Sequence, residues 1–381
     1  MCETRSTLVA SKNPSLKSLA TAATFNALVK QCEARVASRQ WASDALSSPE
    51  PYYFERNQYS RGRKLAKQPA ASQDAKHYGY DAVGRVARIR TWSGFLGRWH
   101  EEELFVPTGD DVVVAYRFRR DGTLMNVDRY THDTEGRLLL HEMYAAEAKR
   151  TGSQRYVWNA GVLERVDVTN WGNGWLLQWD KNGALLTIAS VYDDGQTAEV
   201  YRRPAKGESL AQLFEVIYGR LLELVPRVVA RMRPTSKAYA LLLVLDEEEW
   251  RHALPPSLAI GFEVDRERLR KTDPDRMPEL LWSAADVPSF DTPALELRDA
   301  RLSDAAKRAN QYLWQAGTQN KAKTLMRRLA RELQVLDWSA LRAVSDDFVV
   351  YVTALEGDGE RHVRRDAPAA IKKRLVARGE L

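Results

Sequence analysis

The chain has 381 residues, of which 44% are hydrophobic and 28% charged, and it carries a formal net charge of +6. This length exceeds what one hydrophobic core usually serves, so we expect about two or three domains, and the composition excludes wholesale disorder. The two cysteines, Cys2 and Cys32, are too few for a disulfide framework. The mild positive charge favours an acidic partner without identifying it as protein, nucleic acid or membrane.

No segment of the sequence predicts entry into a membrane. Residues 1–9 contain Glu3 and Arg5 and lack the apolar core of a secretory signal. The longest apolar run, Tyr239 to Leu245, is too short to cross a bilayer. We therefore expect a cytoplasmic protein without a membrane partner.

Residues 1–74 are predicted to be a helical lead-in followed by a basic linker. Pro14 suits the first turn of a helix, and apolar residues follow at helical intervals, so one amphipathic helix is expected within 14–41. Residues 43–74 are rich in Ser, Pro and Ala and include a basic patch at 61–67. This patch is either a solvated connector or a surface that grips a phosphate backbone.

Residues 75–203 are predicted to form a long antiparallel β-meander. Short strands joined by tight turns at a spacing of roughly 8 to 12 residues are typical of this architecture. Here we expect eleven strands and ten turns, with the turns at Gly84, Gly94, Gly109, Gly122, Gly136, Gly152, Gly161, Gly172, Gly183 and Gly195. Alternation supports the prediction, because Tyr116 and Phe118 share one face of their strand while Arg117 and Arg119 share the other. We therefore expect a sheet with one apolar face and one solvated face.

The run YGYDAVGRV at residues 78–86 resembles the YD repeat of RHS and teneurin-like proteins, whose pattern is Y-x-Y-D-x-x-G-R-L. Partial copies that lack the tyrosine or the arginine begin at His132, Trp158, Trp179 and Tyr192. The resemblance is local to residues 77–203 and implies hairpin geometry, in which Asp bonds the turn backbone and Gly takes a positive φ. Any hairpin meander selects similar residues, so convergence is the alternative.

Residues 204–381 are predicted to be a mixed α/β domain that ends in a basic helix. Ser209 and Gln212 match a capping box, and an apolar stripe then continues to Pro226. Buried strands are expected at 239–245, 258–262 and 348–355, with helices near 303–316, 319–336 and 368–378 and a long irregular connection between 272 and 293. Taken as a whole, the chain is predicted to have an α+β fold.

No motif with known catalytic mechanics is present. The six histidines are scattered, and the H-E-x-x-H, G-x-S-x-G and phosphate-loop patterns are absent. His141 and Glu142 are neighbours on one predicted strand, so their side chains should point to opposite faces. The acids at 246–249 are explained by a helix N-terminus. We therefore expect a protein that is not an enzyme and that has no metal and no cofactor.

Aromatic residues provide the strongest binding signal. Four tryptophans fall within 22 residues, and three arginines lie on neighbouring predicted strands. Packing in the core is the usual role of any single tryptophan, but indoles and arginines together are enriched at protein interfaces, so we predict a partner-binding surface. Its residues would be Arg117, Arg119, Trp158, Arg165, Trp171, Trp175 and Trp179. The loop Gly172–Asn173–Gly174 would set Trp171 opposite Trp175 as an exposed cross-strand pair.

The predicted function is that of a non-enzymatic, cytoplasmic protein-binding protein. RHS proteins belong to polymorphic toxin systems, so by association the most concrete version is an immunity protein that neutralises a toxin. The alternative is a nucleic-acid-binding or nucleic-acid-processing factor that uses the 61–67 patch and the basic tail at 357–381. A third alternative is an enzyme whose site is assembled from dispersed residues.

Overall fold

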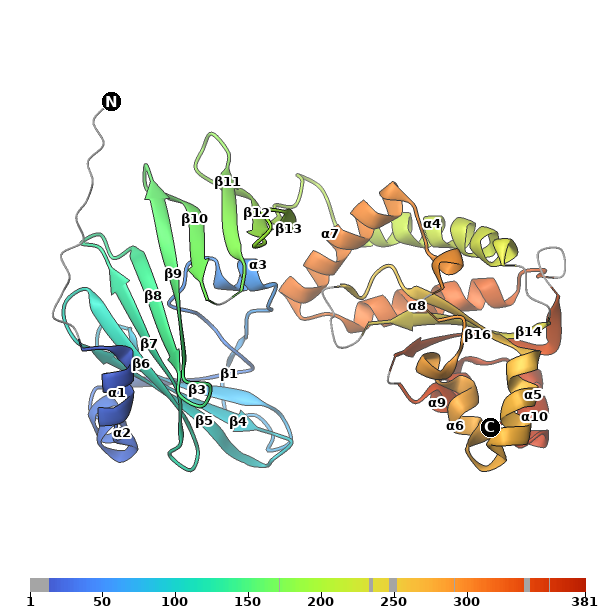
Figure 1. Cartoon of the computed structure of the whole chain (residues 1–381), viewed down its shortest axis with the longest axis horizontal. Coiled ribbons are helices and arrows are strands. Elements are labelled where there is room, and N and C mark those ends of the chain that lie inside the picture. The colour runs from blue at the N-terminus through green and yellow to red at the C-terminus, as the bar shows by residue number, and fades with distance from the viewer. Residues whose placement is uncertain are drawn as a thin grey trace. The chain divides into compact units, whose positions relative to one another are not determined.

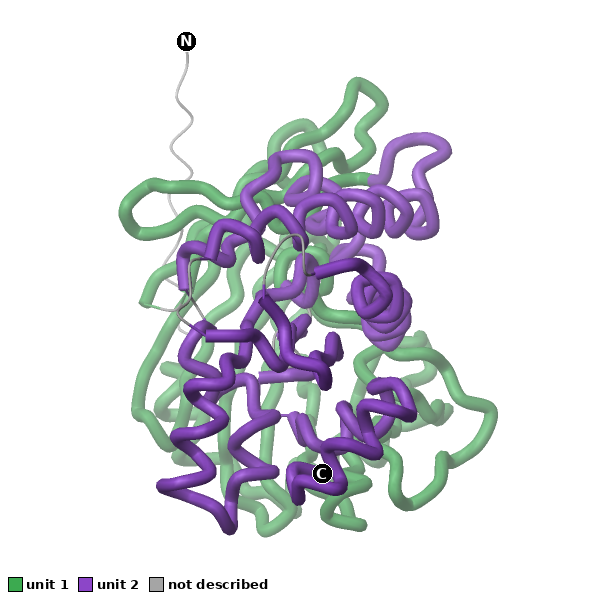
Figure 2. The backbone as a smooth tube through the Cα atoms, turned by 90° about the vertical axis from the view of Figure 1, so that its right-hand side faces the viewer, with its two compact units in different colours: residues 1–203 green, residues 204–381 purple. Residues whose placement is uncertain are grey.

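The computed structural model describes residues 14–170, 172–232, 236–246, 252–290, 292–338, 343–355 and 357–381. It divides into two compact units, unit 1 (Met1–Arg203) and unit 2 (Pro204–Leu381), shown in Figure 2. The fold is of the α+β class, with a long antiparallel sheet in unit 1 and a smaller mixed sheet in unit 2.

Unit 1 is organised around a 13-stranded sheet in which neighbouring strands are antiparallel (Figure 1). From β3 to β13 the strands follow one another in sequence, and β1 and β2 extend the β3 edge. The predicted meander is confirmed, with eleven strands in the described part of residues 75–203. The strands are β1 (Ser38–Ala42), β2 (Lys64–Leu65), β3 (Ala75–Tyr80), β4 (Val86–Ser93), β5 (Arg98–Pro107), β6 (Val112–Arg119), β7 (Leu124–His132), β8 (Leu138–Ala145), β9 (Arg150–Asn159), β10 (Val162–Thr169), β11 (Gly174–Trp179), β12 (Leu185–Val191) and β13 (Thr197–Arg202).

The turn after β3 shows why the D-x-x-G spacing reverses the chain. Gly84 N donates to Asp81 O at 3.0 Å, and the Asp81 carboxylate accepts from the N–H groups of Val83 and Arg85. Gly84 has a φ of +82°, which costs a glycine almost nothing. The turns that begin at Asp133 and Asp180 make the same set of bonds.

One of the ten predicted turn glycines is misplaced. Gly152 lies inside β9, opposite Met143 of β8. The chain reverses before it, where Lys149 adopts a φ of +52°. Lys149 therefore adopts the positive φ that was expected of Gly152 at this turn.

The central strands of unit 1 are covered on both faces, so the expectation of one solvated face is wrong there. On one face, apolar residues of β5 to β8 pack against the helices α1 (Leu16–Ala22) and α2 (Phe25–Glu33). On the other face, a second core includes Phe105, Tyr130 and Tyr156. The helices thus bury the apolar face of Tyr116 and Phe118, as alternation predicts, whereas the face of Arg117, which alternation assigned to solvent, carries the second core.

The lead-in and linker are integral parts of unit 1. Instead of one helix within 14–41, the chain forms α1, α2 and then β1, which pairs with β3. Residues 43–63, which we call the strap, then cross the second face of the sheet. Leu46 N donates to Tyr78 Oη at 2.9 Å, and Gln58 Nε2 donates to Val200 O of β13 at 2.9 Å. The strap contains the short helix α3 (Tyr53–Asn57).

Unit 2 is a three-layer arrangement around a sheet of order β15–β14–β16 (Figure 1). All eight residues of β14 are buried, because apolar helices cover both faces of the sheet. The predicted cap of α4 is present, since Gln212 N donates to Ser209 Oγ at 3.3 Å. The elements are α4 (Leu210–Arg231), β14 (Ala238–Leu245), β15 (Ser257–Phe262), α5 (Glu263–Thr272), α6 (Met277–Trp282), α7 (Ala300–Ala316), α8 (Asn320–Gln334), β16 (Val344–Ala354), α9 (Gly359–Asp366) and α10 (Ala369–Ala377), with short 3₁₀ turns at Pro274–Arg276, Ala284–Asp286 and Pro293–Leu295.

Candidate functional site

Two of the four predicted tryptophans, Trp158 and Trp179, stabilise the sheet through hydrogen bonds. Trp158 Nε1 donates to Leu138 O and Trp179 Nε1 donates to Leu163 O, both at 2.8 Å. Each indole is half-buried and bonds to the preceding strand, Trp158 of β9 to β8 and Trp179 of β11 to β10. Trp175 is also half-buried, and the guanidinium of Arg56 lies 4.5 Å from the centre of its ring. Trp171 lies outside the described residues, so the predicted Trp171–Trp175 pair does too.

The predicted arginines and tryptophans do not all lie on one face of the sheet. Arg117 lies on the strap-covered face and faces Glu103 at 3.5 Å, while Arg119 pairs with Glu147 at 2.9 Å. Arg165 precedes Val166, which pairs directly with Trp175 across β10 and β11, so Arg165 points to the opposite face of the sheet from that indole. Its partner is Asp167 at 2.7 Å.

A different aromatic cluster, which the sequence analysis missed, lies at the β1 side of the sheet. Trp41 of β1 stacks on His77 of β3 with ring centres 4.4 Å apart, and also on Trp99 of β5 at 5.7 Å. Trp92 of β4 meets Trp99 edge-on at 5.5 Å. The Arg90 guanidinium lies 3.9 Å from the Trp99 ring centre. We call these five half-buried side chains the tryptophan platform.

The platform adjoins an exposed hairpin tip, residues 94–97, between β4 and β5. Phe95 is 96% exposed and Leu96 is exposed beside it. The base of the tip is held firmly, because Gly94 N donates to Asp74 Oδ1 at 2.7 Å and Trp92 Nε1 donates to Ala71 O at 2.9 Å. A Cβ on Gly94 would lie 2.4 Å from the Ser72 backbone, so only glycine allows this close contact.

The charges around the platform are largely paired. Arg88 binds Glu33 of α2 at 2.5 Å and also Glu102 of β5, and Arg39 binds Glu33. Burial, followed by the Arg90 cation, lowers the pKa of His77, which favours the neutral imidazole. The platform is thus an aromatic surface with modest charge, suited to stacking and apolar contact.

One feature of the sequence could have predicted the tryptophan platform. Trp92 and Trp99 flank the 94–97 turn as a cross-strand pair, which is the same logic that was applied to Trp171 and Trp175. The contribution of Trp41 could not be anticipated, since it requires β1 to pair with β3 beyond the meander.

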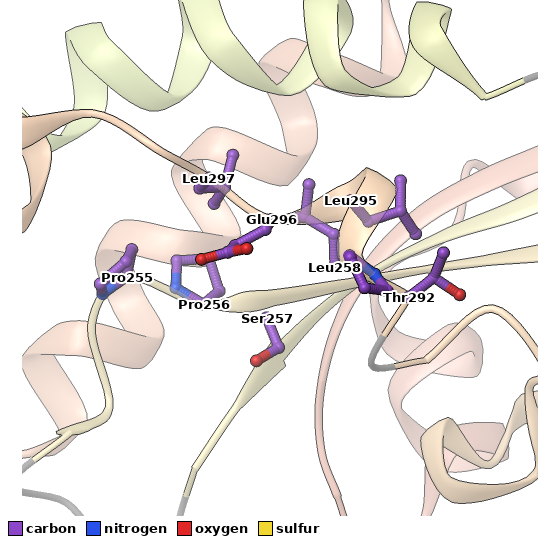
Figure 3. Close-up of a pocket in the computed structure, with 9 residues that line it drawn as sticks. Pro255, Pro256, Ser257, Leu258, Thr292, Leu295, Glu296 and Leu297 are labelled. Atoms are coloured by element: carbon purple, nitrogen blue, oxygen red, sulfur yellow. The ribbon is translucent and has the colours of Figure 1, made fainter.

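Other parts of the chain offer less chemistry. A cavity of about 390 Å³ in unit 2 is lined by Pro255, Leu258, Thr292, Leu297 and their neighbours (Figure 3), and its one ionisable lining residue, Glu296, pairs with Arg298 at 2.6 Å. Within the described ranges, no group of three or more His, Cys, Asp or Glu side chains could hold a metal ion. In the same ranges, no helix combines the length and hydrophobicity needed to span a bilayer.

As predicted, His141 and Glu142 point to opposite faces of β8. Glu142 forms a two-pronged ion pair with Arg129, at 2.7 and 2.9 Å. His141 is buried on the strap-covered face, where its Nε2 lies 2.9 Å from Asp128 Oδ1.

Comparison with known proteins gives no family for this chain. No protein-family model and no curated protein matches it. Any functional assignment therefore rests on the geometry of the molecule.

Proposed function

We propose that the chain is a non-enzymatic binding protein that docks a protein partner on the tryptophan platform and the adjoining hairpin tip. The exposure of Phe95 carries this proposal. Leaving a phenylalanine in water forgoes about 1.5 to 3 kcal/mol of burial free energy, which a docked partner would restore. Tryptophan and arginine, which build the platform behind it, are the residues that dominate interface hot spots.

A protein partner suits this surface better than a nucleic acid. Phosphate backbones are held by cations that are free to release counterions. Three arginines at the platform are already engaged, Arg88 and Arg39 with carboxylates and Arg90 with the Trp99 ring. In the 61–67 patch, Arg61 pairs with Glu55 at 3.1 Å. An apolar tip beside half-buried indoles resembles the core of a protein interface.

Toxin neutralisation is the specific version of this proposal. It rests on the resemblance of the hairpins to YD repeats and on the association of RHS proteins with toxin systems. A cytoplasmic location belongs to the same version, because an immunity protein acts where its own toxin would damage the producing cell.

Affinity capture with Phe95→Ser tests the proposal. The matched control is Val83→Ser, which removes an apolar side chain that is 72% exposed at the tip of the β3–β4 hairpin. A partner bound by the wild-type chain should be retained by Val83→Ser. Phe95→Ser should weaken its binding about 30-fold, the equivalent of a 2 kcal/mol hot spot. Equal capture by the two variants would contradict the proposal.

Two further outcomes separate the alternatives. If the captured partner is a toxin, wild-type chain but not Phe95→Ser should relieve its growth inhibition. If instead the wild-type chain binds labelled single-stranded oligonucleotides, with an affinity that falls with salt and is lost in Phe95→Ser, the surface belongs to the nucleic-acid class.

A further inference from the structure

A polar cavity of about 420 Å³ lies within unit 1, between the strap and the sheet face it crosses. This volume is in the range of small-ligand sites. The strap contributes Glu50 and Tyr53 to its wall, and the sheet contributes Glu103, Asn126, Asp128 and His141. We call it the strap pocket. It lies on the opposite face of the sheet from the tryptophan platform.

His141 presents an unused acceptor to this cavity. Its side chain is only 6% exposed, and its ring stacks on Tyr130 with centres 4.6 Å apart. Because a carboxylate accepts hydrogen bonds, the 2.9 Å contact with Asp128 Oδ1 places the imidazole proton on Nε2. In the neutral form of this tautomer Nδ1 carries a lone pair, and the atom has no hydrogen-bond partner.

Glu50 presents a second acceptor beside the first. Its Oε2 accepts from Tyr156 Oη and from Arg56 Nη2, both at 2.8 Å, so the carboxylate is fixed in position. Its Oε1 lies 3.6 Å from His141 Nδ1, beyond hydrogen-bond reach. With the imidazole neutral, two acceptors therefore face each other with no donor between them. A buried polar group left in this way is destabilising, and a donor that reaches it removes the penalty.

The chemistry of the gap selects the ligand. A group with several N–H bonds on one centre can donate to both acceptors at once, whereas a hydroxyl has one proton and a carboxylate has none. Positive charge is favoured as well. Among the described residues, Asp128 has no Lys or Arg at ion-pair distance, while Glu50 and Glu103 each have an arginine. We infer that the strap pocket binds a small organic cation, whose ammonium or guanidinium group donates to His141 Nδ1 and Glu50 Oε1.

The test uses the full chain labelled with ¹⁵N-histidine, because the imidazole nitrogen shift reports hydrogen bonding at Nδ1. The probes are n-butylammonium and n-butylguanidinium, with butanol and butyrate as uncharged and anionic controls. Each molecule is titrated to about 10 mM, which nearly saturates a site with a dissociation constant of about 1 mM. Both cations should give a saturating shift of His141 Nδ1. No shift with either cation, or an equal shift with butanol or butyrate, would overturn the inference.

Two variants test whether the cation binds in the strap pocket. Glu50→Gln removes the charge and should weaken binding at least 10-fold. Because this change also loosens Arg56, a second variant leaves the buried network alone: Ser47→Trp adds bulk at an exposed strap position on the pocket wall. It should abolish binding without moving the His141 signals of the free chain. If Ser47→Trp binds the cations as tightly as wild type, the site lies elsewhere and the inference fails. Phe95 variants should leave cation binding unchanged, so this test is independent of partner docking.

Discussion

Arg203, the residue directly after β13, donates from Nη1 to Asp180 Oδ2 at 2.7 Å. In two earlier turns of the same geometry, the aspartate is bound by the arginine four residues later, Arg85 on Asp81 and Arg137 on Asp133. At Asp180 that position is Ala184, and Arg203, which follows β13, supplies the missing cation. A repeat that looks incomplete in sequence is thus completed in space.

This contact predicts a specific acid titration. The hydrogen bond from Arg203, followed by backbone N–H groups of the turn, lowers the pKa of Asp180 to about 2. The folded value lies below the ordinary value of about 3.9, so the stabilisation is present above about pH 4 and is lost as pH falls towards 2. In Arg203→Ala, the Asp180 pKa should rise towards its ordinary value, while that of Asp133 stays unchanged. Carboxyl ¹³C NMR titration measures both, and an unchanged Asp180 would contradict the prediction.

Removing Arg56 should destabilise unit 1 strongly. Its guanidinium is fully buried and pairs with Glu50 at 2.8 Å, so Arg56→Met leaves a buried carboxylate without its cation. Breaking such a pair costs about 3 to 5 kcal/mol. The control is Arg165→Met, since the exposed Arg165–Asp167 pair contributes roughly 0 to 1 kcal/mol. Urea unfolding followed by tryptophan fluorescence measures the free energy of unfolding of both variants. If both lose the same amount, the buried pair stabilises unit 1 no more than the exposed pair does.

A second buried network makes a pH-dependent prediction for unit 2. Arg266 is fully buried and binds Asp347 at 2.8 Å and Glu380 at 2.6 Å. Burial by itself raises the pKa of Asp347, but hydrogen bonding and charge from Arg266 outweigh it, so the pKa lies below its ordinary value. Arg266→Met should reverse this shift, and the variant should lose about 3 to 5 kcal/mol near pH 7.

In Arg266→Met, Asp347 and Glu380 lose their cation, and protonation at low pH neutralises them. The difference in free energy of unfolding between this variant and wild type should therefore become smaller as pH falls from about 7 to about 4. Fluorescence of the buried Trp282, whose Nε1 donates to Glu380 O at 2.7 Å, reports on this region. Arg276→Met, which breaks an exposed pair with Glu279, serves as the control and should change stability little at either pH. If the difference in free energy of unfolding between Arg266→Met and wild type does not change with pH, the prediction is wrong.

Two turn glycines should respond differently to alanine. Gly136 has a φ of +76°, and an alanine there should cost roughly 1 to 2 kcal/mol. Gly109 has an ordinary φ, and its nearest potential neighbour is Asp111 Oδ1 at 3.5 Å. Gly109→Ala should be neutral or stabilising by about 0.4 to 1 kcal/mol, because it restricts the unfolded chain. Thermal unfolding of the two variants checks this ranking, and the reverse order would refute it.

The hairpins of unit 1 were predictable because their determinants are local. Asp81 and Gly84 specify a turn through bonds made within a few residues, and strand alternation then follows from the meander. The exception, Gly152, shows the limit of counting glycines, since Lys149 can also take a positive φ. Local chemistry fixes turn geometry better than residue type alone.

The strap and both candidate sites depend on contacts that no local pattern encodes. Gln58 reaches a strand 142 residues away, and the strap has no regular apolar spacing that would announce its path. His141 meets Asp128 only because β7 and β8 pair in one register, which sets the two side chains on a shared face. A shift of one residue would have separated them.

The strap also changes how unit 1 should unfold. A meander whose strands pair only with their sequence neighbours behaves like a one-dimensional array, in which strands can fray from either end independently. Here the segment 43–63 contacts Tyr78 of β3, Tyr156 of β9 and Val200 of β13. Loss of the last strand therefore also removes support from the first. The array is closed into a single cooperative element, and its folding rate should be limited by the closure of this long loop rather than by the fast formation of hairpins.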